Sequence, residues 1–224
     1  MKDKILLTFG VTEFLFLAAG GLLLIFSLIT QTEMHRAPTE SNIVSNLLLQ
    51  VCPLTAGVVN AVFIFVTFLV AIPALMMPMT RGWLILHGYM VVFCALFTLI
   101  LGLRIWFETL KTRANLSHIW NDQSTTVQSL LQESLSCCGF FNSTSPPFVV
   151  DSTCPSAAFA ATMRGCVTPF NTMANNYLDL IFTGAFGIVG VDVAMVLATA
   201  MLIKDRKEKE RYRHIDEKSG AGAF

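Results

Sequence analysis

Four long runs of apolar residues dominate the hydropathy pattern of the chain. They are residues 5–30, 41–80, 82–103 and 180–203, and their only Asp, Glu, Lys or Arg residues are Glu13 and Asp192. A membrane-spanning helix needs about 20 mainly apolar residues at 1.5 Å of rise per residue. Each run is long enough, so the pattern predicts four transmembrane helices.

The boundaries of the predicted spans follow from where charged and polar residues resume. We predict spans at residues 5–29, 53–76, 83–107 and 178–203, which leaves residues 1–4, 30–52, 77–82, 108–177 and 204–224 outside the membrane. Composition supports this division, because 54% of the 224 residues are hydrophobic and 13% are charged, whereas soluble domains carry about 25% charged residues. The predicted fold class is an all-α membrane protein with a four-helix transmembrane bundle.

Basic residues indicate which way the spans run. Lys and Arg gather on the cytoplasmic side of membrane proteins. They precede span one, lie between spans two and three, and follow span four: Lys2, Lys4, Arg81, Lys204, Arg206, Lys207, Lys209, Arg211, Arg213 and Lys218. We therefore predict that both termini are cytoplasmic and that residues 77–82 form a short inner turn. Residues 30–52 and 108–177 are then a small and a large extracellular loop.

Two further signals fall in the same large loop. Asn115-Leu116-Ser117 and Asn142-Ser143-Thr144 are glycosylation sequons. Four of the six cysteines also lie there: Cys137, Cys138, Cys154 and Cys166. A loop that matures outside the cytosol meets an oxidising compartment in which disulfides persist. Charge, sequons and cysteines thus favour the same side of the membrane for this loop.

The four loop cysteines allow three disulfide connectivities. A bond between neighbours Cys137 and Cys138 would need a strained ring across one peptide bond, because paired cysteines usually have Cα atoms about 5.5 Å apart. Two connectivities remain open, and each ties the adjacent pair to both Cys154 and Cys166. Gly139 supplies the backbone freedom for a sharp turn directly afterwards. We expect a small disulfide-stapled domain that is mainly helical.

In this topology the chain resembles the tetraspanins. The resemblance covers almost the whole chain and rests on Cys137-Cys138-Gly139, on two later loop cysteines, and on a large outer loop between spans three and four. It implies disulfides Cys137–Cys166 and Cys138–Cys154. It also implies a non-enzymatic organiser that recruits other membrane proteins, and itself, as partners. The sequence departs from the family in lacking cytoplasmic juxtamembrane cysteines, since Cys52 and Cys94 lie elsewhere.

Within the family, the compact loop with two predicted disulfides is most similar to the fungal branch associated with appressorium-mediated host penetration. That similarity implies a role in polarised growth of infection structures, beside a membrane NADPH oxidase complex. It also implies residence in the plasma membrane, in endosomal or vacuolar membranes, or in both.

An apolar cluster between the loop cysteines has two interpretations. Its members are Phe140, Phe141, Phe148, Val149 and Val150. They either fill the small core of the loop or form a partner-binding patch, since exposed apolar clusters usually mark contact surfaces. Farther along, we expect a short helix with Pro155 near its first turn and Gly165 as its cap.

Four polar residues inside the predicted spans are candidates for function, because buried polar groups in a membrane normally face the bundle interior. Counting along the helices places Glu13 about 12 Å and Asp192 about 16 Å deep, with His87 nearer the surface. Two acids at similar depth could share a proton or form hydrogen bonds with other helices. We expect Asn60 to form a hydrogen bond that helps the helices pack. These residues also motivate the alternative function, a channel or transporter, or an accessory subunit of a membrane complex.

Other functions have little support in the sequence. It shows no nucleophile–base grouping, no metal-ligand spacing and no phosphate loop, and its net charge of zero suggests no nucleic acid partner. We expect no enzyme activity, no metal and no cofactor apart from a sterol or other lipid between the spans. In the tail, Tyr212 and Ile215 fit the tyrosine-based sorting pattern, and nearby basic residues favour contact with membrane lipid.

Overall fold

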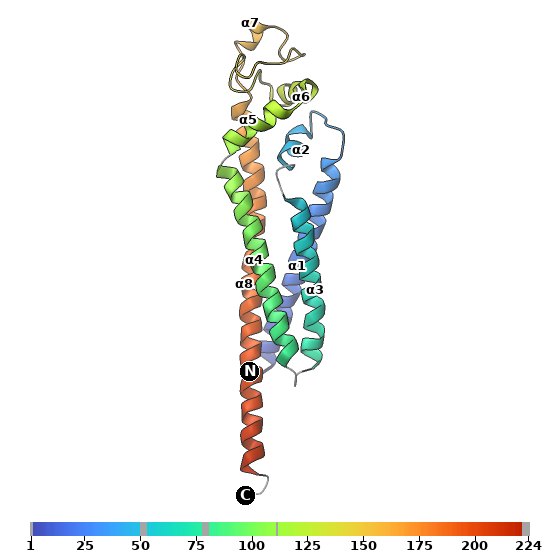
Figure 1. The fold of residues 1–224 in the computed structure, drawn as a ribbon, viewed down its shortest axis with the longest axis vertical. Helices are drawn as coiled ribbons and strands as arrows, with labels where there is room; N and C mark the ends of the chain where they lie inside the picture. The colour runs from blue at the N-terminus through green and yellow to red at the C-terminus, as the bar shows by residue number, and fades with distance from the viewer. Residues whose placement is uncertain (1, 50–52, 78–80, 111, 221–224) are drawn as a thin grey trace. The chain divides into compact units, whose positions relative to one another are not determined.

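The computed structural model describes residues 2–49, 53–77, 81–110 and 112–220, and those residues are mainly helical. Four helices are long: α1 (Lys2–Met34), α3 (Leu54–Met76), α4 (Arg81–Leu110) and α8 (Val167–Ser219). Four are short: α2 (Ile43–Leu49), α5 (Thr112–Asp122), α6 (Thr125–Leu135) and α7 (Ala157–Ala160) (Figure 1). No strand occurs in the described residues, where β-pairing is limited to isolated bridges. Cys52 lies outside the described residues.

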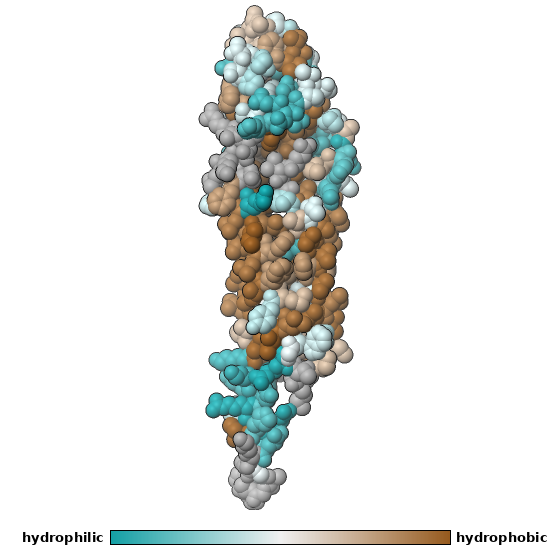
Figure 2. All heavy atoms as spheres, in the orientation of Figure 1, coloured by the Kyte–Doolittle hydropathy of each residue, from teal (hydrophilic) through white to brown (hydrophobic). Residues whose placement is uncertain are grey.

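The four long helices are each long and apolar enough to cross a membrane, which confirms the prediction of four membrane helices. Their outward faces carry large apolar side chains such as Phe14, Leu96 and Leu197, and Figure 2 shows the resulting broad hydrophobic surface. A helix satisfies its own backbone hydrogen bonds, which is the condition for lying in hydrocarbon. Exposed apolar surface of this kind is suited to lipid rather than to water.

The chain divides into two compact units. The first contains residues Met1–Phe26, Thr55–Ile100 and Ala185–Phe224, and it is built from parts of α1, α3, α4 and α8. Its core comprises Phe9, Phe16, Ile64, Ala74, Leu84, Val91, Cys94, Met195, Ala198 and Leu202. Gly20 allows α1 to lie close to α3, because a Cβ atom on Gly20 would lie 2.5 Å from Cγ2 of Ile64.

The second unit contains residues Ser27–Leu54 and Leu101–Gly184. Its core comprises Ile43, Leu47, Leu48, Trp120, Leu131, Leu135, Cys137, Phe140, Cys166, Val167, Phe170 and Ala174. The rings of Trp120 and Phe140 lie 5.6 Å apart at its centre. Helix α2 packs against α6, so the segment before the second membrane helix contributes to the same core. A small core of this kind benefits from covalent crosslinks.

Candidate functional site

The stapled segment, residues 137–166, begins where α6 ends. Ser136 has a left-handed backbone with φ of 48°, and the N–H of Cys137 donates to the carbonyl of Gln132 at 3.1 Å. A left-handed residue after a helix is a common way to stop it and turn the chain. The turn delivers both cysteines and Gly139 into the interior, where all three are buried.

Two disulfides close the stapled segment. Cys137 is bonded to Cys166 and Cys138 to Cys154, with Cα separations of 5.0 and 5.9 Å. These are the two pairs that the resemblance implied. Backbone hydrogen bonds reinforce them: the N–H of Cys166 donates to the carbonyl of Gly139 at 2.9 Å, and the N–H of Cys138 donates to the carbonyl of Arg164 at 3.0 Å. The two ends of the segment are thus held side by side by covalent and hydrogen bonds together.

Two glycines are required by close backbone contacts within the stapled segment. Gly139 has φ of 70°, as its predicted role in a sharp turn requires, and a Cβ there would lie 2.1 Å from the carbonyl oxygen of Asn142. A Cβ on Gly165 would lie 2.2 Å from the carbonyl oxygen of Phe141. The prediction that Gly165 caps a helix is wrong, because α7 ends at Ala160 and Ala161 caps it.

The start of α7 also differs from the prediction. Ser156 is its N-cap and accepts a hydrogen bond from the N–H of Phe159 at 3.3 Å. Pro155 therefore lies before the helix rather than near its first turn. A serine at the N-cap stabilises the start of a helix because its side chain accepts a hydrogen bond from one of the free N–H groups of the first turn.

Gln132 is the polar centre of the stapled segment and was not identified from the sequence. Its buried amide makes four hydrogen bonds. The Oε1 atom accepts from the N–H groups of Gly139 and Val149, at 3.2 and 3.0 Å. The Nε2 group donates to the carbonyl of Val149 at 2.7 Å and to Oδ2 of Asp151 at 2.5 Å. One side chain thus joins α6 to both halves of the segment.

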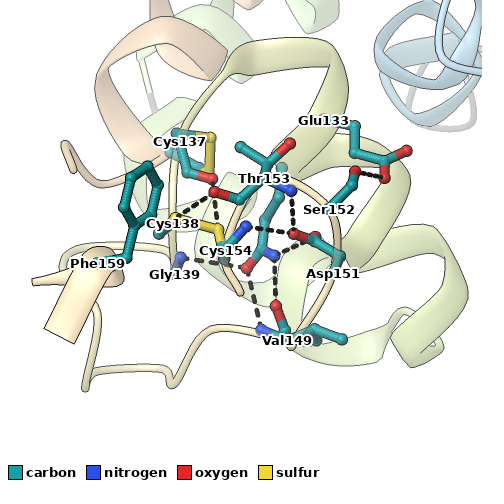
Figure 3. Close-up of a disulfide and its surroundings, with 12 residues drawn as sticks. Glu133, Cys137, Cys138, Gly139, Val149, Asp151, Ser152, Thr153, Cys154 and Phe159 are labelled. Atoms are coloured by element: carbon teal, nitrogen blue, oxygen red, sulfur yellow. Dashed lines mark hydrogen bonds between the residues drawn. A yellow bond between two sulfur atoms is a disulfide. The ribbon is translucent and has the colours of Figure 1, made fainter. Parts of the chain in front are cut away.

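Asp151 extends this network to the second disulfide. Its Oδ1 atom accepts from the N–H groups of Thr153 and Cys154, at 2.9 and 2.6 Å (Figure 3). A carboxylate that bonds backbone N–H groups two and three residues ahead stabilises a tight turn. This turn leads the chain into Cys154. In the sequence, the only signal was an Asp-Ser-Thr run before a cysteine.

The predicted partner-binding cluster is divided between the core and the surface. Phe140 is fully buried in the core of the second unit, so its assignment to a surface patch is wrong. Phe148 and Val149 are half-buried, while Phe141 and Val150 are exposed. The rings of Phe140 and Phe141 are nevertheless in contact, edge to face with centroids 4.8 Å apart, so the exposed Phe141 packs on the buried Phe140. Phe159, which was not predicted, is also an exposed apolar side chain of the stapled segment.

The sequon at Asn142 lies in an exposed turn. Its Oδ1 atom accepts hydrogen bonds from the N–H groups of Thr144 and Ser145, at 2.9 and 2.8 Å, and from the Thr144 hydroxyl at 2.8 Å. The side chain of the other sequon residue, Asn115, lies outside the described part of the chain. Glycosylation of both remains a prediction.

The first unit contains a buried acid–base pair between helices α1 and α4. Oε2 of Glu13 lies 3.3 Å from Nε2 of His87, and both side chains are almost completely buried. The two atoms are close without the alignment of a hydrogen bond, and neither residue has another hydrogen-bond partner in the described chain. The ring of Phe9 packs beside His87 at 5.6 Å. The sequence placed His87 nearer the surface and did not suggest this pair.

A second polar group joins α3 to α4 in the same unit. Nδ2 of Asn60 donates to the hydroxyl of Thr98 at 2.8 Å, as expected for a packing hydrogen bond. Sγ of Cys94 lies 3.6 Å from the hydroxyl of Thr67. Asp192 of α8 is fully buried beside Thr98, but its carboxylate oxygens are not aligned for a hydrogen bond with any described residue. Glu13 is thus paired with His87, whereas Asp192 lies beside Thr98, the residue that accepts the Asn60 hydrogen bond.

The predicted sorting residues of the tail, Tyr212 and Ile215, are both exposed on α8. Their spacing places them on neighbouring turns of one helix. A role in sorting remains a prediction.

Comparison with known proteins agrees with this architecture. The family model described as the tetraspanin family matches residues 6–205, which is most of the chain. No curated protein and no solved structure matches the chain.

Proposed function

Because the chain belongs to the tetraspanin family, we propose that it organises other membrane proteins without catalysing a reaction, and that the stapled segment selects its partners. The observation that carries this proposal is a contrast within residues 137–166. Two disulfides and the Gln132 amide hold the backbone, while Phe141, Val150 and Phe159 remain exposed. Apolar side chains on a fixed frame bind with little loss of conformational entropy, which favours specific recognition.

The experiment compares two double variants of the full-length protein. Phe141→Ser with Val150→Ser removes apolar surface, whereas Phe141→Leu with Val150→Ile keeps it. We expect the serine variant to reach the membrane with both disulfides intact and to lose its partners in mild-detergent capture, quantified by mass spectrometry. The conservative variant should retain them. Equal partner recovery with both variants would place specificity outside these side chains.

A segment exchange tests the same proposal on a larger scale. Residues 141–150 are replaced by a segment of the same length from another tetraspanin, with Phe140, Asp151 and all four cysteines kept because they hold the frame. We expect a protein that folds and reaches the membrane but fails to replace the original in a deletion strain. Full replacement would assign specificity to the membrane helices or the tail.

A more specific role is suggested by the similarity of the compact loop to those of fungal tetraspanins. We place the protein in the plasma membrane or in endosomal and vacuolar membranes, with a role in polarised growth and host penetration beside an NADPH oxidase complex. Proximity labelling from the full-length protein should recover subunits of that oxidase. A labelled set without them would remove this partner from the proposal.

We also propose the orientation of the chain in the membrane: both termini are cytoplasmic, and the segments inside and outside the membrane have the boundaries predicted from the sequence. Its support is the distribution of Lys and Arg along the sequence. We expect a glycan on Asn142 that is removed by endoglycosidase and is absent from a Thr144→Ala variant. Cleavage within residues 137–166 by a protease that reaches only the cytosolic face of sealed vesicles would indicate the opposite orientation.

A second candidate function, a channel or transporter, has one observation in its favour, the buried Glu13–His87 pair. Proton or cation flux through liposomes containing the purified protein tests it. Flux that disappears in a Glu13→Gln variant would support transport, and flux equal to that of empty liposomes would exclude it.

A further inference from the structure

The part of α8 that follows the apolar run is attached to the rest of the first unit along one face. Arg206 is almost fully buried, and its Nη1 group donates to the carbonyl of Ala74 at 2.8 Å. This carbonyl lies in the last turn of α3, where a cation is favoured. Two residues of the same neighbourhood, Glu210 of α8 and Arg81 of α4, form an ion pair of 2.7 Å. These contacts set the rotation of the α8 extension.

A second face of this extension carries three cations that form no ion pair in the described chain, with one exposed acid, Glu208, beside Lys204 and Arg211. Lys204, Lys207 and Arg211 are spaced by three and then four residues, so they lie on one side of the helix. All three are exposed, and no ion pair involves them in the described part of the chain. Other basic side chains differ, since Lys209 pairs with Asp205 and Arg213 with Glu217. We name Lys204, Lys207 and Arg211 the basic face.

We propose that the basic face binds the headgroup of a polyphosphorylated inositol lipid in the leaflet from which the end of α8 emerges. Position supports a lipid. The apolar run ends at Ile203, and the basic face then covers about 10 Å of helix. The headgroup layer of one leaflet is about 5–8 Å thick, and long Lys and Arg side chains reach back toward it.

The spacing of the charges favours one multivalent headgroup over scattered monovalent lipids. Neighbouring residues of the basic face have Cβ atoms about 5–6 Å apart, so the three cations lie within about 10 Å along the helix, and their long side chains can reach the phosphates of one ring. An inositol ring with several phosphates offers its charges within that distance and stands farther from the hydrocarbon than a glycerol phosphate does. The hydrophilic end of the molecule beside the apolar surface in Figure 2 contains this part of α8.

The test uses two charge-matched double variants of the full-length protein in phosphatidylcholine nanodiscs. Lys204→Gln with Lys207→Gln removes two charges from the basic face. Lys209→Gln with Arg213→Gln removes the same number from other faces. The probe is a labelled phosphatidylinositol bisphosphate at a few per cent of the lipid, and its enrichment around the protein is measured by energy transfer to a dye on α8.

We expect the first variant to lower the affinity for the probe about thirtyfold, because each cation near a membrane surface contributes about a fivefold factor. The second variant should change it by no more than about threefold, since screening weakens charges beyond about 8 Å. The first variant should fold normally because both residues are exposed and Gln is a good helix former, which circular dichroism can verify.

Three outcomes would overturn the proposal. Equal losses in both variants would indicate an effect of net charge alone. Equal enrichment of phosphatidylserine at the same total lipid charge would indicate diffuse attraction without a headgroup site. Binding of an acidic peptide with the same dependence on Lys204 and Lys207, without any enrichment of the lipid, would assign the basic face to a protein partner.

Discussion

Replacing Gln132 with methionine removes the polar centre of the stapled segment without creating a cavity. Methionine has a similar length and fills irregular space well, so the change isolates the loss of hydrogen bonds. Gln128 provides a matched control, because it has the same side chain one turn earlier on α6. Among the described residues, the Gln128 amide makes one hydrogen bond, from Nε2 to the carbonyl of Trp120 at 2.9 Å.

The expected cost follows from the burial of the groups that Gln132 contacts. Gly139 is buried, so its N–H would be left unpaired at a cost of about 1–3 kcal/mol. Val149 and Asp151 are half-buried, so each of their three lost bonds costs about 1 kcal/mol because water replaces part of it. The sum is about 4–6 kcal/mol. The single bond of Gln128 predicts about 1 kcal/mol.

Amide hydrogen exchange on the full-length protein in detergent measures this difference. Peptides covering residues 137–150 should exchange about a thousandfold to ten-thousandfold faster after Gln132→Met, and about fivefold faster after Gln128→Met, at about 1.4 kcal/mol per factor of ten. Peptides from α3 should be unchanged in both variants. If the two variants accelerated exchange equally, Gln132 would not be the element that holds the segment.

Three further predictions follow from other contacts. Cys137→Ser should lower the stability of the second unit by about 2–5 kcal/mol, seen as faster proteolysis and retention in the endoplasmic reticulum, whereas unchanged proteolysis would argue against a structural disulfide. In detergent thermal unfolding, Glu13→Leu alone and His87→Leu alone should each cost more than the two together, because a single change leaves a buried polar partner; additive losses would show that the pair is not coupled. Gly165→Ala should cost about 3 kcal/mol or more because its Cβ would meet backbone. Gly187→Ala on α8, where a Cβ meets nothing within 4 Å, should stabilise the protein by up to about 1 kcal/mol, because Ala is the better helix former. Equal circular-dichroism melting curves for the two variants would contradict this.

The membrane architecture could be predicted from the sequence because it depends on composition over long windows. Each apolar run is longer than the hydrocarbon core needs, so errors of a few residues at the ends do not change the result. The disulfides of the stapled segment could also be predicted in part, from local chemistry and from the family resemblance. Adjacent cysteines cannot easily bond each other, and the family resemblance then implied the two pairs that the structure contains.

Contacts between distant segments could not be predicted in this way. Phe140 and Phe141 are adjacent and chemically identical, yet one fills the core and the other is exposed. Gln132 gives no sign in the sequence that Gly139, Val149 and Asp151 will meet its amide. In each case the environment comes from chain segments that only folding brings together.

The membrane helices show the same division. Hydropathy along the chain already identifies Glu13, His87 and Asp192 as polar residues within apolar runs. Such residues need partners because hydrocarbon offers none. Which partners they have depends on how the helices pack against one another. The rotation of α1 and α4 brings Glu13 to His87, whereas Asp192 of α8 lies beside Thr98. Hydropathy is a property of each residue and adds along the chain, but a contact depends on the relative rotation of two packed helices, which their side chains determine jointly.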